Sequence, residues 1–209
     1  MSGFKFIAYL ERLRWIKRWG LKRNVVEENV PEHSWNVACI AHMLGLINHR
    51  YFGGNVDAAK IAAIALYHDA SEIITGDMPS PIKYKSRVIL DAYRTIEHEA
   101  EQELLAKLPP ELQEDFRSLL ISKEIDPLFH DYVKAADLIS AYLKCRSEVA
   151  FGNHEFNDAL KDLERRVRDL ALPEAHKFMS LFVDHYTLTL DQLLSEHDQA
   201  NFSNSSIKS

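Results

Sequence analysis

The chain of 209 residues has only two cysteines, Cys39 and Cys145. They are too far apart in the sequence to form the close Cys-x-x-Cys pair that is typical of zinc-thiolate and dithiol redox sites. Both lie in segments with strongly helical patterns, and we expect them to be reduced, buried thiols. The scarcity of cysteine therefore excludes a disulfide framework and a thiolate-based metal site.

An excess of positive charge is also missing. The formal net charge is -6 and the isoelectric point is about 5.9, so no general electrostatic attraction to a nucleic acid polymer or an anionic membrane surface is expected. No apolar run reaches the length of a membrane-spanning helix, and the first residues lack the basic-then-apolar pattern of a signal peptide. We therefore predict a cytoplasmic protein without nucleic acid or membrane partners.

Glycine and proline are sparse, with seven of each, and they stand mostly at segment boundaries. Between them apolar residues recur at helical spacing, and no alternating run supports a sheet. The fold class is therefore predicted to be all-α, a single-domain multi-helix bundle over residues 1–195. Residues 196–209 are rich in Ser, Asn and charge, and we expect them to form a mobile tail.

The apolar spacing and the boundary residues define the expected helices. They are Phe4–Lys17, Ser34–Arg50, Asp57–Ile74, Ser86–Leu108, Pro110–Ser122, Asp126–Gly152, Phe156–Leu172 and Pro173–Leu194. The polar, irregular connections Arg18–Glu32 and Gly76–Pro81 lie next to titratable residues, and loops of this kind often carry function.

His68 and Asp69 are adjacent in the apolar stretch of the expected third helix. Burying an imidazole and a carboxylate together is costly unless something compensates them. A divalent metal ion would do so, because neutral imidazole and ionised carboxylate are both good ligands for such ions. Glu72 is three residues further on and shares a helix face with Asp69, so it could handle a proton.

Two further residues can join this pair. His33 stands at the expected start of the second helix, where Ser34 could cap the first turn; a lone histidine there is more often a capping or surface residue than a ligand. Asp137 is a single carboxylate in an apolar stretch and is expected to be buried. Taken alone, it could equally pair with Lys134 or Lys144 or accept hydrogen bonds from backbone amides.

His33, His68, Asp69 and Asp137 together offer two imidazoles and two carboxylates. This mixed set suits manganese, iron, cobalt, nickel or zinc better than an ion that prefers thiolates. We therefore expect one divalent metal ion per subunit, which is cobalt, manganese or another first-row transition metal. Such an ion lowers the pKa of bound water and acts as a Lewis acid, which are the two requirements for hydrolysing a phosphate ester. The residues therefore predict a metal-dependent hydrolase.

The order His33, then His68–Asp69, then Asp137 resembles the HD-domain metallophosphohydrolases, a helical superfamily. The likeness becomes narrower in four segments, which look like bacterial 5'-deoxynucleotidases of the YfbR type. These segments are Arg18–Trp19, Glu28–Ser34, Tyr67–Glu72 and Thr75–Tyr84. The resemblance runs from the first helix to about Leu194.

This resemblance implies a homodimer that hydrolyses deoxyribonucleoside 5'-monophosphates to deoxyribonucleosides and inorganic phosphate. It implies that Arg18 orients the phosphate, that Glu72 serves catalysis, and that Asp69 and Asp137 contact substrate as well as metal. Trp19 and a loop would enclose the nucleoside; the loop residues are Asp77, Met78, Pro79 and Ser80. The chain departs from the family at Met78 and Ser80, where leucine and threonine are more usual, and this puts the fine substrate preference in question.

Each of these residues also has an ordinary structural interpretation. Arg18 belongs to a cationic run that in isolation is more often a solvated surface, and Trp19 alone is more often a packing residue. Asp77 follows a glycine and could be a turn residue. Glu72 could merely orient a ligand histidine.

Two other functions fit the metal ligands. One is another HD-domain nucleotide phosphohydrolase or phosphodiesterase, because the ligands alone do not select the phosphate ester. A triphosphate would require several cations along its extra phosphates, whereas the matched segments offer mainly Arg18. The other is a non-catalytic helical regulatory module whose metal only stabilises the fold.

Overall fold

The structure is a computed structural model, and it describes residues 3–195. These residues form helices joined by turns, with one isolated β-bridge and no sheet among them, so the all-α prediction is confirmed. None of the helices in this part of the chain is long and apolar enough to cross a membrane. Residues 196–209, for which a mobile tail was predicted, lie outside the described residues, and the domain boundary near residue 195 stays a prediction.

The α-helices are α1 (Phe6–Arg12), α2 (Val30–Phe52), α3 (Ala58–Tyr67), α4 (Glu72–Thr75), α5 (Ser80–Lys83), α6 (Arg87–Leu105), α7 (Pro110–Leu120), α8 (Pro127–Ala150), α9 (Asn157–Arg168) and α10 (Pro173–Phe182). Short 3-10 helices are η1 (Leu13–Trp15), η2 (Ser122–Glu124), η3 (His154–Phe156) and η4 (Val183–His185). Residues 190–195 are also helical.

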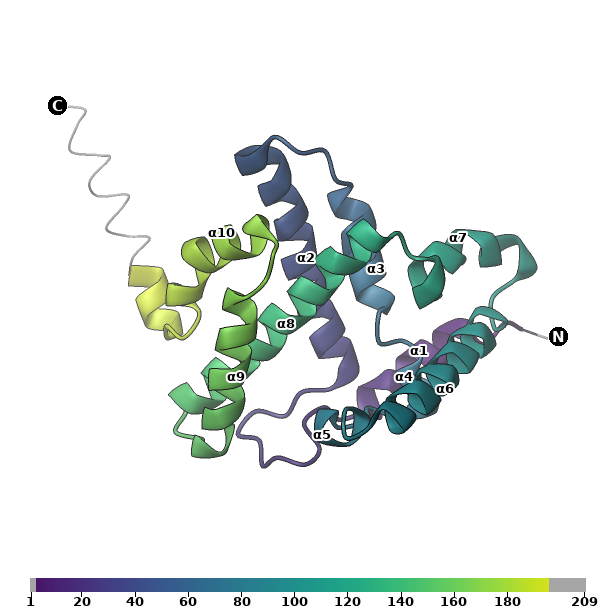
Figure 1. Cartoon of the computed structure of the whole chain (residues 1–209), viewed down its shortest axis with the longest axis horizontal. Coiled ribbons are helices and arrows are strands. Elements are labelled where there is room, and N and C mark those ends of the chain that lie inside the picture. The colour runs from purple at the N-terminus through teal and green to yellow at the C-terminus, as the bar shows by residue number, and fades with distance from the viewer. Residues whose placement is uncertain (1–2, 196–209) are drawn as a thin grey trace.

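The long helices α2 and α8 cross in the middle of the molecule, and α3, α9 and α10 pack around them (Figure 1). Their buried apolar side chains form the larger of two hydrophobic clusters, with Leu44, Ile64 and Ile139 at its centre. A smaller cluster joins α1, α6 and α7, and it includes Phe6 and Leu104. The hydrophobic interior therefore has two parts.

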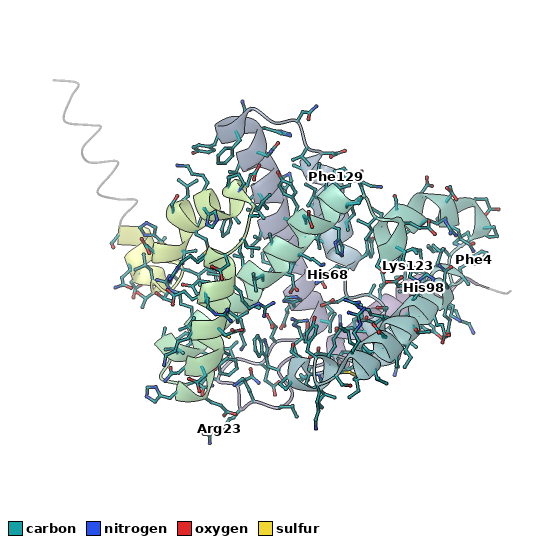
Figure 2. The ribbon with its side chains drawn as sticks, viewed as in Figure 1. Phe4, Arg23, His68, His98, Lys123 and Phe129 are labelled. Carbon is teal, nitrogen blue, oxygen red and sulfur yellow. The ribbon has the colours of Figure 1, made fainter. Side chains whose placement is uncertain are left out.

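The chain passes from the larger cluster to the smaller one just after α3. Ala65 belongs to the first cluster and Ala70 to the second. His68 and Asp69 lie between them in the sequence, and Figure 2 places His68 near the middle of the molecule. Both residues therefore lie at the junction of the two clusters.

The start of α2 differs from the prediction. The helix begins at Val30, four residues before the expected Ser34, because Asn29 and Glu32 form a reciprocal capping box. The Asn29 side chain accepts from the Glu32 amide over 3.0 Å, and the Glu32 carboxylate accepts from the Asn29 amide over 3.2 Å. Ser34 is buried inside the helix instead of capping it, and His33 is fully buried in the first turn.

The expected third helix is broken. Instead of one helix over Asp57–Ile74, α3 ends at Tyr67, and two turns follow in which Ala70 donates to Tyr67 and Glu72 to Asp69, each over 3.0 Å. Asp69 and Glu72 are therefore neighbours across a turn and not along one helix face.

Two other expectations are wrong. The helix predicted over Pro173–Leu194 is interrupted, because α10 ends at Phe182 and the 3-10 turn η4 follows. Cys39 is exposed, whereas Cys145 is buried as expected. Cys39 lines an open cavity together with Trp35 and Phe182, so packed side chains do not cover it.

A close approach between α2 and α3 brings the two histidines together. A Cβ on Gly45 would lie 2.6 Å from the Cβ of Ala58, so only glycine allows this packing distance. The two helices run in opposite directions on either side of a turn (Figure 1), which places the start of α2 beside the end of α3. The His33 and His68 rings are 5.4 Å apart between centroids.

Candidate functional site

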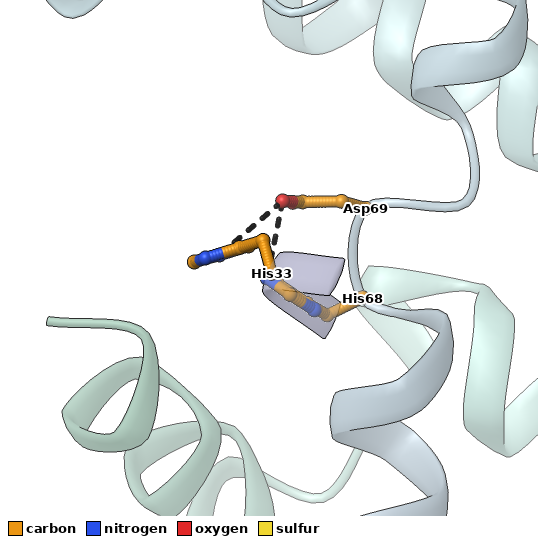
Figure 3. A group of neighbouring side chains, drawn as sticks. All are labelled: His33, His68 and Asp69. Atoms are coloured by element: carbon orange, nitrogen blue, oxygen red, sulfur yellow. Dashed lines mark ion pairs between the residues drawn. The ribbon is translucent and has the colours of Figure 1, made fainter. Parts of the chain in front are cut away.

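His33, His68 and Asp69 form the centre of the site, and each offers a ligand atom within 4.8 Å of the others. Oδ2 of Asp69 lies 3.2 Å from Nε2 of His68 and 3.7 Å from Nε2 of His33. Figure 3 shows the three side chains converging on one point. The structure therefore brings together residues that are 35 positions apart in the sequence.

Asp137 approaches the same point from α8. Its Oδ1 lies 3.0 Å from Nε2 of His33. The side chain is 45% exposed, so the prediction that Asp137 is buried is wrong. Lys144, one of its alternative partners, pairs with Glu148 at 2.5 Å instead. Asp137 therefore closes the site on its solvent side.

The second nitrogen of each ring faces away from the centre. Nδ1 of His68 donates to the carbonyl of Ala65 over 2.7 Å. Nδ1 of His33 lies 3.4 Å from Oγ of Ser140 and 3.8 Å from Oε1 of Glu28. These contacts favour a proton on Nδ1 and leave the lone pair of Nε2 directed at the centre.

Both Nε2 atoms are buried, and although carboxylate oxygens lie 3.0 and 3.2 Å away, neither nitrogen makes a hydrogen bond of good geometry among the described residues. Such unpaired buried atoms are uncommon in folded proteins and require an explanation. A divalent cation held by the two rings and the carboxylates would satisfy them, and the donor types suit a first-row metal ion. The residues present therefore fit the predicted metal.

The charges around the centre favour a cation. Burial alone would lower the pKa of His68, but the adjacent Asp69 carboxylate reverses this and raises the pKa to about 9. Burial likewise opposes ionisation of Asp69, yet His68 and then Arg18 hold its pKa well below the usual range. The site therefore keeps an ionised carboxylate and attracts positive charge.

Arg18 lies directly beside this centre, with only 15% of its side chain exposed. Its Nη1 donates to Oδ2 of Asp69 over 2.9 Å, and its Nε lies 3.4 Å from Oε2 of Glu28. Burial works against its charge, but Asp69 and Asp137 raise its pKa. Arg18 is therefore a half-buried, permanently charged group and not part of a solvated surface.

Glu72 begins α4 next to the centre. Its Oε2 is buried and has no hydrogen-bond partner in the described part of the chain. Burial and the neighbouring carboxylates of Asp69 and Asp77 raise the pKa of Glu72 to about 9. Glu72 therefore holds a proton at neutral pH in this arrangement.

Trp19 is fixed by its neighbours. Its Nε1 donates to Oε2 of Glu28 over 3.0 Å, and its ring packs against Phe156 at 5.4 Å. Its φ of 59° is the one positive value for a non-glycine residue within residues 3–195. A left-handed tryptophan is strained, and such strain persists where surrounding contacts enforce it.

The loop between α4 and α5 also borders the site. Burial raises the pKa of Asp77, while the charge of Arg18 opposes the rise, so the two groups are close enough to interact. Met78 and Pro79 are half-buried, and Ser80 is exposed at the start of α5. The loop is held from α6, where the hydroxyl of Tyr93 donates to the carbonyl of Gly76 over 3.2 Å.

Sequence reasoning assigned no role to Glu28, Ser140 or Tyr93. Glu28 belongs to one of the matched segments, and its place just before α2 could have drawn attention to it. Ser140 lies three residues after Asp137 and so shares its helix face, which is a usable signal. Tyr93 has no such signal, because its contact with Gly76 depends on how α6 packs.

The sequence of the chain is similar to that of a known protein family. The family model described as "5'-deoxynucleotidase YfbR-like" matches residues 5–186. A 5'-deoxynucleotidase of Photorhabdus laumondii is 49% identical over 188 residues, which cover 90% of this chain and 95% of the relative. A 5'-deoxynucleotidase of Vibrio vulnificus is 46% identical over 193 residues, which cover 92% of this chain and all of the relative.

Two solved structures are similar in fold. An HD-domain phosphohydrolase from Listeria innocua superposes with a TM-score of 0.76 at 21% identity, covering 94% of this chain and 98% of that one. The HD phosphohydrolase of cyanophage S-2L, solved with dA and one catalytic Zn²⁺ ion, has a TM-score of 0.58 at 22% identity, covering 87% and 96%. The fold is therefore that of the HD-domain phosphohydrolases.

Proposed function

The chain belongs to the YfbR-like family of 5'-deoxynucleotidases, and from this premise we propose which of its residues carry out the reaction. Its substrates are deoxyribonucleoside 5'-monophosphates, which it hydrolyses to deoxyribonucleosides and inorganic phosphate. The single observation that supports the site best is the convergence of two Nε2 atoms that lack a hydrogen-bond partner among the described residues with Asp69, beside the half-buried Arg18.

His33, His68, Asp69 and Asp137 would hold one divalent ion per subunit. When bound, the ion supplies Lewis acidity at the phosphate and lowers the pKa of water at the site. Cobalt, manganese or another first-row ion suits these ligands, because ligand type does not select among them. Asp69 and Asp137 also border the space beside Arg18 where substrate would lie.

Arg18 orients the phosphate in this proposal. Its Nε and Nη1 face Glu28 and Asp69, and these contacts fix the plane of the guanidinium. The rigid fork can then present its remaining N–H donors to phosphate oxygens in a set direction. Its buried charge offsets the negative charge that substrate brings into the site.

Glu72 moves the proton. Burial and the carboxylates of Asp69 and Asp77 raise the pKa of Glu72 to about 9. A bound cation would lower this pKa again, so the carboxyl can exchange a proton near neutral pH. From Oε2, which lacks a protein partner among the described residues, it can donate a proton to the departing 5' oxygen. A Glu72 ionised by a nearby cation could instead accept a proton from the attacking water.

Selectivity for the deoxy sugar is assigned to Trp19 and the Asp77–Ser80 loop. The Trp19 ring is held in place by Glu28 and Phe156, so it cannot move easily to make room for an extra hydroxyl. A 2'-hydroxyl buried there without a partner would be penalised. Met78 and Ser80, where the chain departs from the family, would adjust the preference between bases.

The assembly proposed for the protein is a homodimer. Trp15 and Trp35 are 61% and 63% exposed, and they line two neighbouring cavities that share Pro31 and Glu32. An exposed apolar surface of this kind suits a second copy of the chain. Light scattering during gel filtration tests the dimer: Trp35→Glu should give monomers if this surface is the interface.

A cytoplasmic location is likewise proposed from the sequence.

A panel of phosphate-release assays tests the activity. The substrates are deoxy and ribo 5'-monophosphates, a 3'-monophosphate, a triphosphate and a cyclic nucleotide, each with several divalent ions and with EDTA. Release confined to deoxy 5'-monophosphates, and abolished by EDTA, supports the proposal. Release from the triphosphate or the cyclic nucleotide would favour another HD-domain activity, and no release with any ion would favour a regulatory module.

Arg18→Ala and Glu72→Ala test the residue roles in the same assay. Both should reduce turnover strongly, whereas Arg87→Ala removes an exposed arginine of α6 and serves as a matched control. Near-normal turnover by Arg18→Ala and Glu72→Ala would contradict the assignment.

A further inference from the structure

Glu28 is a buried carboxylate in the segment that leads into α2, with 8% of its surface exposed. It lies opposite Arg18, whose backbone N–H donates to the Glu28 carbonyl over 3.0 Å. A buried carboxylate is costly unless donors or positive groups surround it. The donors and positive groups around Glu28 therefore indicate why a carboxylate is buried at this position.

Three of them are predicted site residues. Oε2 of Glu28 accepts from Nε1 of Trp19 over 3.0 Å and lies 3.4 Å from Nε of Arg18. Oε1 lies 3.8 Å from Nδ1 of His33. One carboxylate thus contacts the predicted phosphate-binding cation, the predicted nucleoside-binding ring and a predicted metal ligand.

The contact with His33 has a chemical consequence. Nε2 of His33 is directed at Asp69 and Asp137, so Nδ1 is the nitrogen on the far side of the ring. A negative charge near Nδ1 favours the tautomer that carries its proton there. This leaves the Nε2 lone pair available and makes the imidazole a stronger ligand.

The contact with Arg18 fixes its orientation. Glu28 lies at Nε and Asp69 at Nη1, so the guanidinium is flanked by a carboxylate on two of its edges. Nη2 donates no hydrogen bond within residues 3–195, where Nη1 to Asp69 is the side-chain hydrogen bond of Arg18. It is the nitrogen that is free to meet a phosphate oxygen.

We propose that Glu28 is a positioning residue that holds Arg18, Trp19 and His33 in their working orientations through a single carboxylate. It acts through these residues and touches neither substrate nor the reacting atoms. The inference rests on the proposed function, because it takes its meaning from the roles assigned there to Arg18 and His33.

The principal variant is Glu28→Gln. The amide oxygen can still accept from Trp19, while the negative charge facing Arg18 and His33 is lost. Calorimetric titration of the metal-stripped protein with Mn²⁺ should show affinity about 10- to 100-fold weaker than that of the wild type, as expected for loss of a group that orients a ligand histidine. Glu28→Asp keeps the charge and should retain more of the affinity.

Steady-state kinetics at saturating metal test the contact with Arg18. Glu28→Gln should lower kcat/KM for a deoxyribonucleoside 5'-monophosphate and weaken inhibition by inorganic phosphate. If Glu28 acts through Arg18, Glu28→Gln should lower kcat/KM much less in an Arg18→Ala background than in the wild type. The effects of the two substitutions would then not be additive.

Glu174→Gln is the matched control. Glu174 is also buried, at 4% exposure, and accepts from Asn48 and Tyr132 over 2.6 and 2.9 Å, away from the metal ligands. The substitution Glu174→Gln should lower the thermal stability of the protein without changing its affinity for Mn²⁺. Wild-type Mn²⁺ affinity and kcat/KM in Glu28→Gln would overturn the inference, as would losses that match those of Glu174→Gln.

Failure of the inference can be told apart from failure of the proposed function. If the wild type releases no phosphate from deoxyribonucleoside 5'-monophosphates, the proposed function fails, while the Mn²⁺ titration still decides the role of Glu28. If Arg18→Ala is impaired and Glu28→Gln behaves as the wild type in both measurements, only the inference fails.

Discussion

Nη1 of Arg18 lies 2.9 Å from Oδ2 of Asp69, and this same oxygen faces Nε2 of both His33 and His68. One carboxylate oxygen thus joins the predicted phosphate-binding cation to the predicted metal ligands. A phosphate oxygen near these ligands would also be within reach of Arg18. Metal and arginine would therefore act on one phosphate group.

The first prediction concerns the planar shape of the Arg18 guanidinium. Arg18→Lys keeps the positive charge but loses the planar fork that contacts Asp69 and Glu28 simultaneously. We expect kcat/KM for a deoxyribonucleoside 5'-monophosphate to fall by about 100-fold or more, as for other lost transition-state donors. Arg87→Lys on the exposed face of α6 is the control. A fall of less than about threefold would mean that charge alone suffices.

The second prediction concerns the metal and stability. The candidate ligands come from α2, the turn after α3, and α8, so the unfolded chain has no comparable site. At a free ion concentration 100 times Kd, binding should stabilise the protein by about 2.7 kcal/mol and raise Tm by roughly 5 to 10 °C. EDTA should reverse this in differential scanning calorimetry. His68→Ala should show no metal-dependent rise.

The third prediction concerns acid stability. Glu148 on α8 is fully buried and accepts hydrogen bonds from the amides of Val25 and Val26, from Asn153 and from Lys144. Burial alone would raise its pKa, but these donors, with Lys144 first, lower it to about 2. Because the folded pKa lies below the unfolded value, the stabilisation is complete above about pH 4.5 and is lost as pH falls through 2.

Glu148→Gln tests this directly. Urea unfolding at pH 7 should show a loss on the order of 3 kcal/mol, from the pKa shift alone, and the difference from the wild type should shrink as the pH approaches 2. Glu111→Gln, an exposed acid of α7, should be neutral throughout. A difference that stays constant from pH 7 to pH 2 would exclude ionisation as its source.

The fourth prediction concerns the two thiols. Cys39 is exposed on α2, whereas Cys145 is fully buried on α8, and burial raises the pKa of its thiol to about 12. Only a thiolate reacts quickly, so the native chain should react with one equivalent of a thiol reagent and the unfolded chain with two. Cys39→Ser should abolish the native reaction. A fast second equivalent in folded protein would contradict the burial of Cys145.

The fifth prediction concerns the loop after α4. Tyr93→Phe removes the hydroxyl that donates to the Gly76 carbonyl and should loosen the loop that carries Asp77. Loss of one hydrogen bond costs about 1 kcal/mol, so KM for the deoxyribonucleoside 5'-monophosphate should rise by about fivefold with little change in kcat. A lower kcat at unchanged KM would instead place Tyr93 in the chemical step.

Much of the site could be predicted because its chemistry is visible in residue types. An adjacent His68–Asp69 pair in an apolar stretch is unusual enough to suggest a ligand without any coordinates. The positions of α6, α7 and α8 also follow from local signals, with Ser86 and Asp126 as N-caps and Pro110 at the first position of α7.

The features that could not be predicted depend on contacts that local sequence patterns do not reveal. The early start of α2 comes from a capping box in which Asn29 is the N-cap and Glu32 is its partner, whereas Ser34 was the predicted cap. The break after Tyr67 has no proline or glycine to mark it. Asp137 was expected to be buried because its neighbours are apolar, but burial depends on which helices cover that side of α8.

The segment carrying Arg18 is closed at its base, where Val30 donates to the Ile16 carbonyl over 3.1 Å and Arg18 to the Glu28 carbonyl over 3.0 Å. Arg18 therefore takes its position from the base of the loop and not from its tip. The outer part of this loop is held separately, because the amides of Val25 and Val26 donate to Glu148 on α8. Insertions or deletions between residues 20 and 27 should therefore disturb the Glu148 contacts while the arginine stays in register with α2. A change of loop length there should lower the melting temperature more than it lowers turnover.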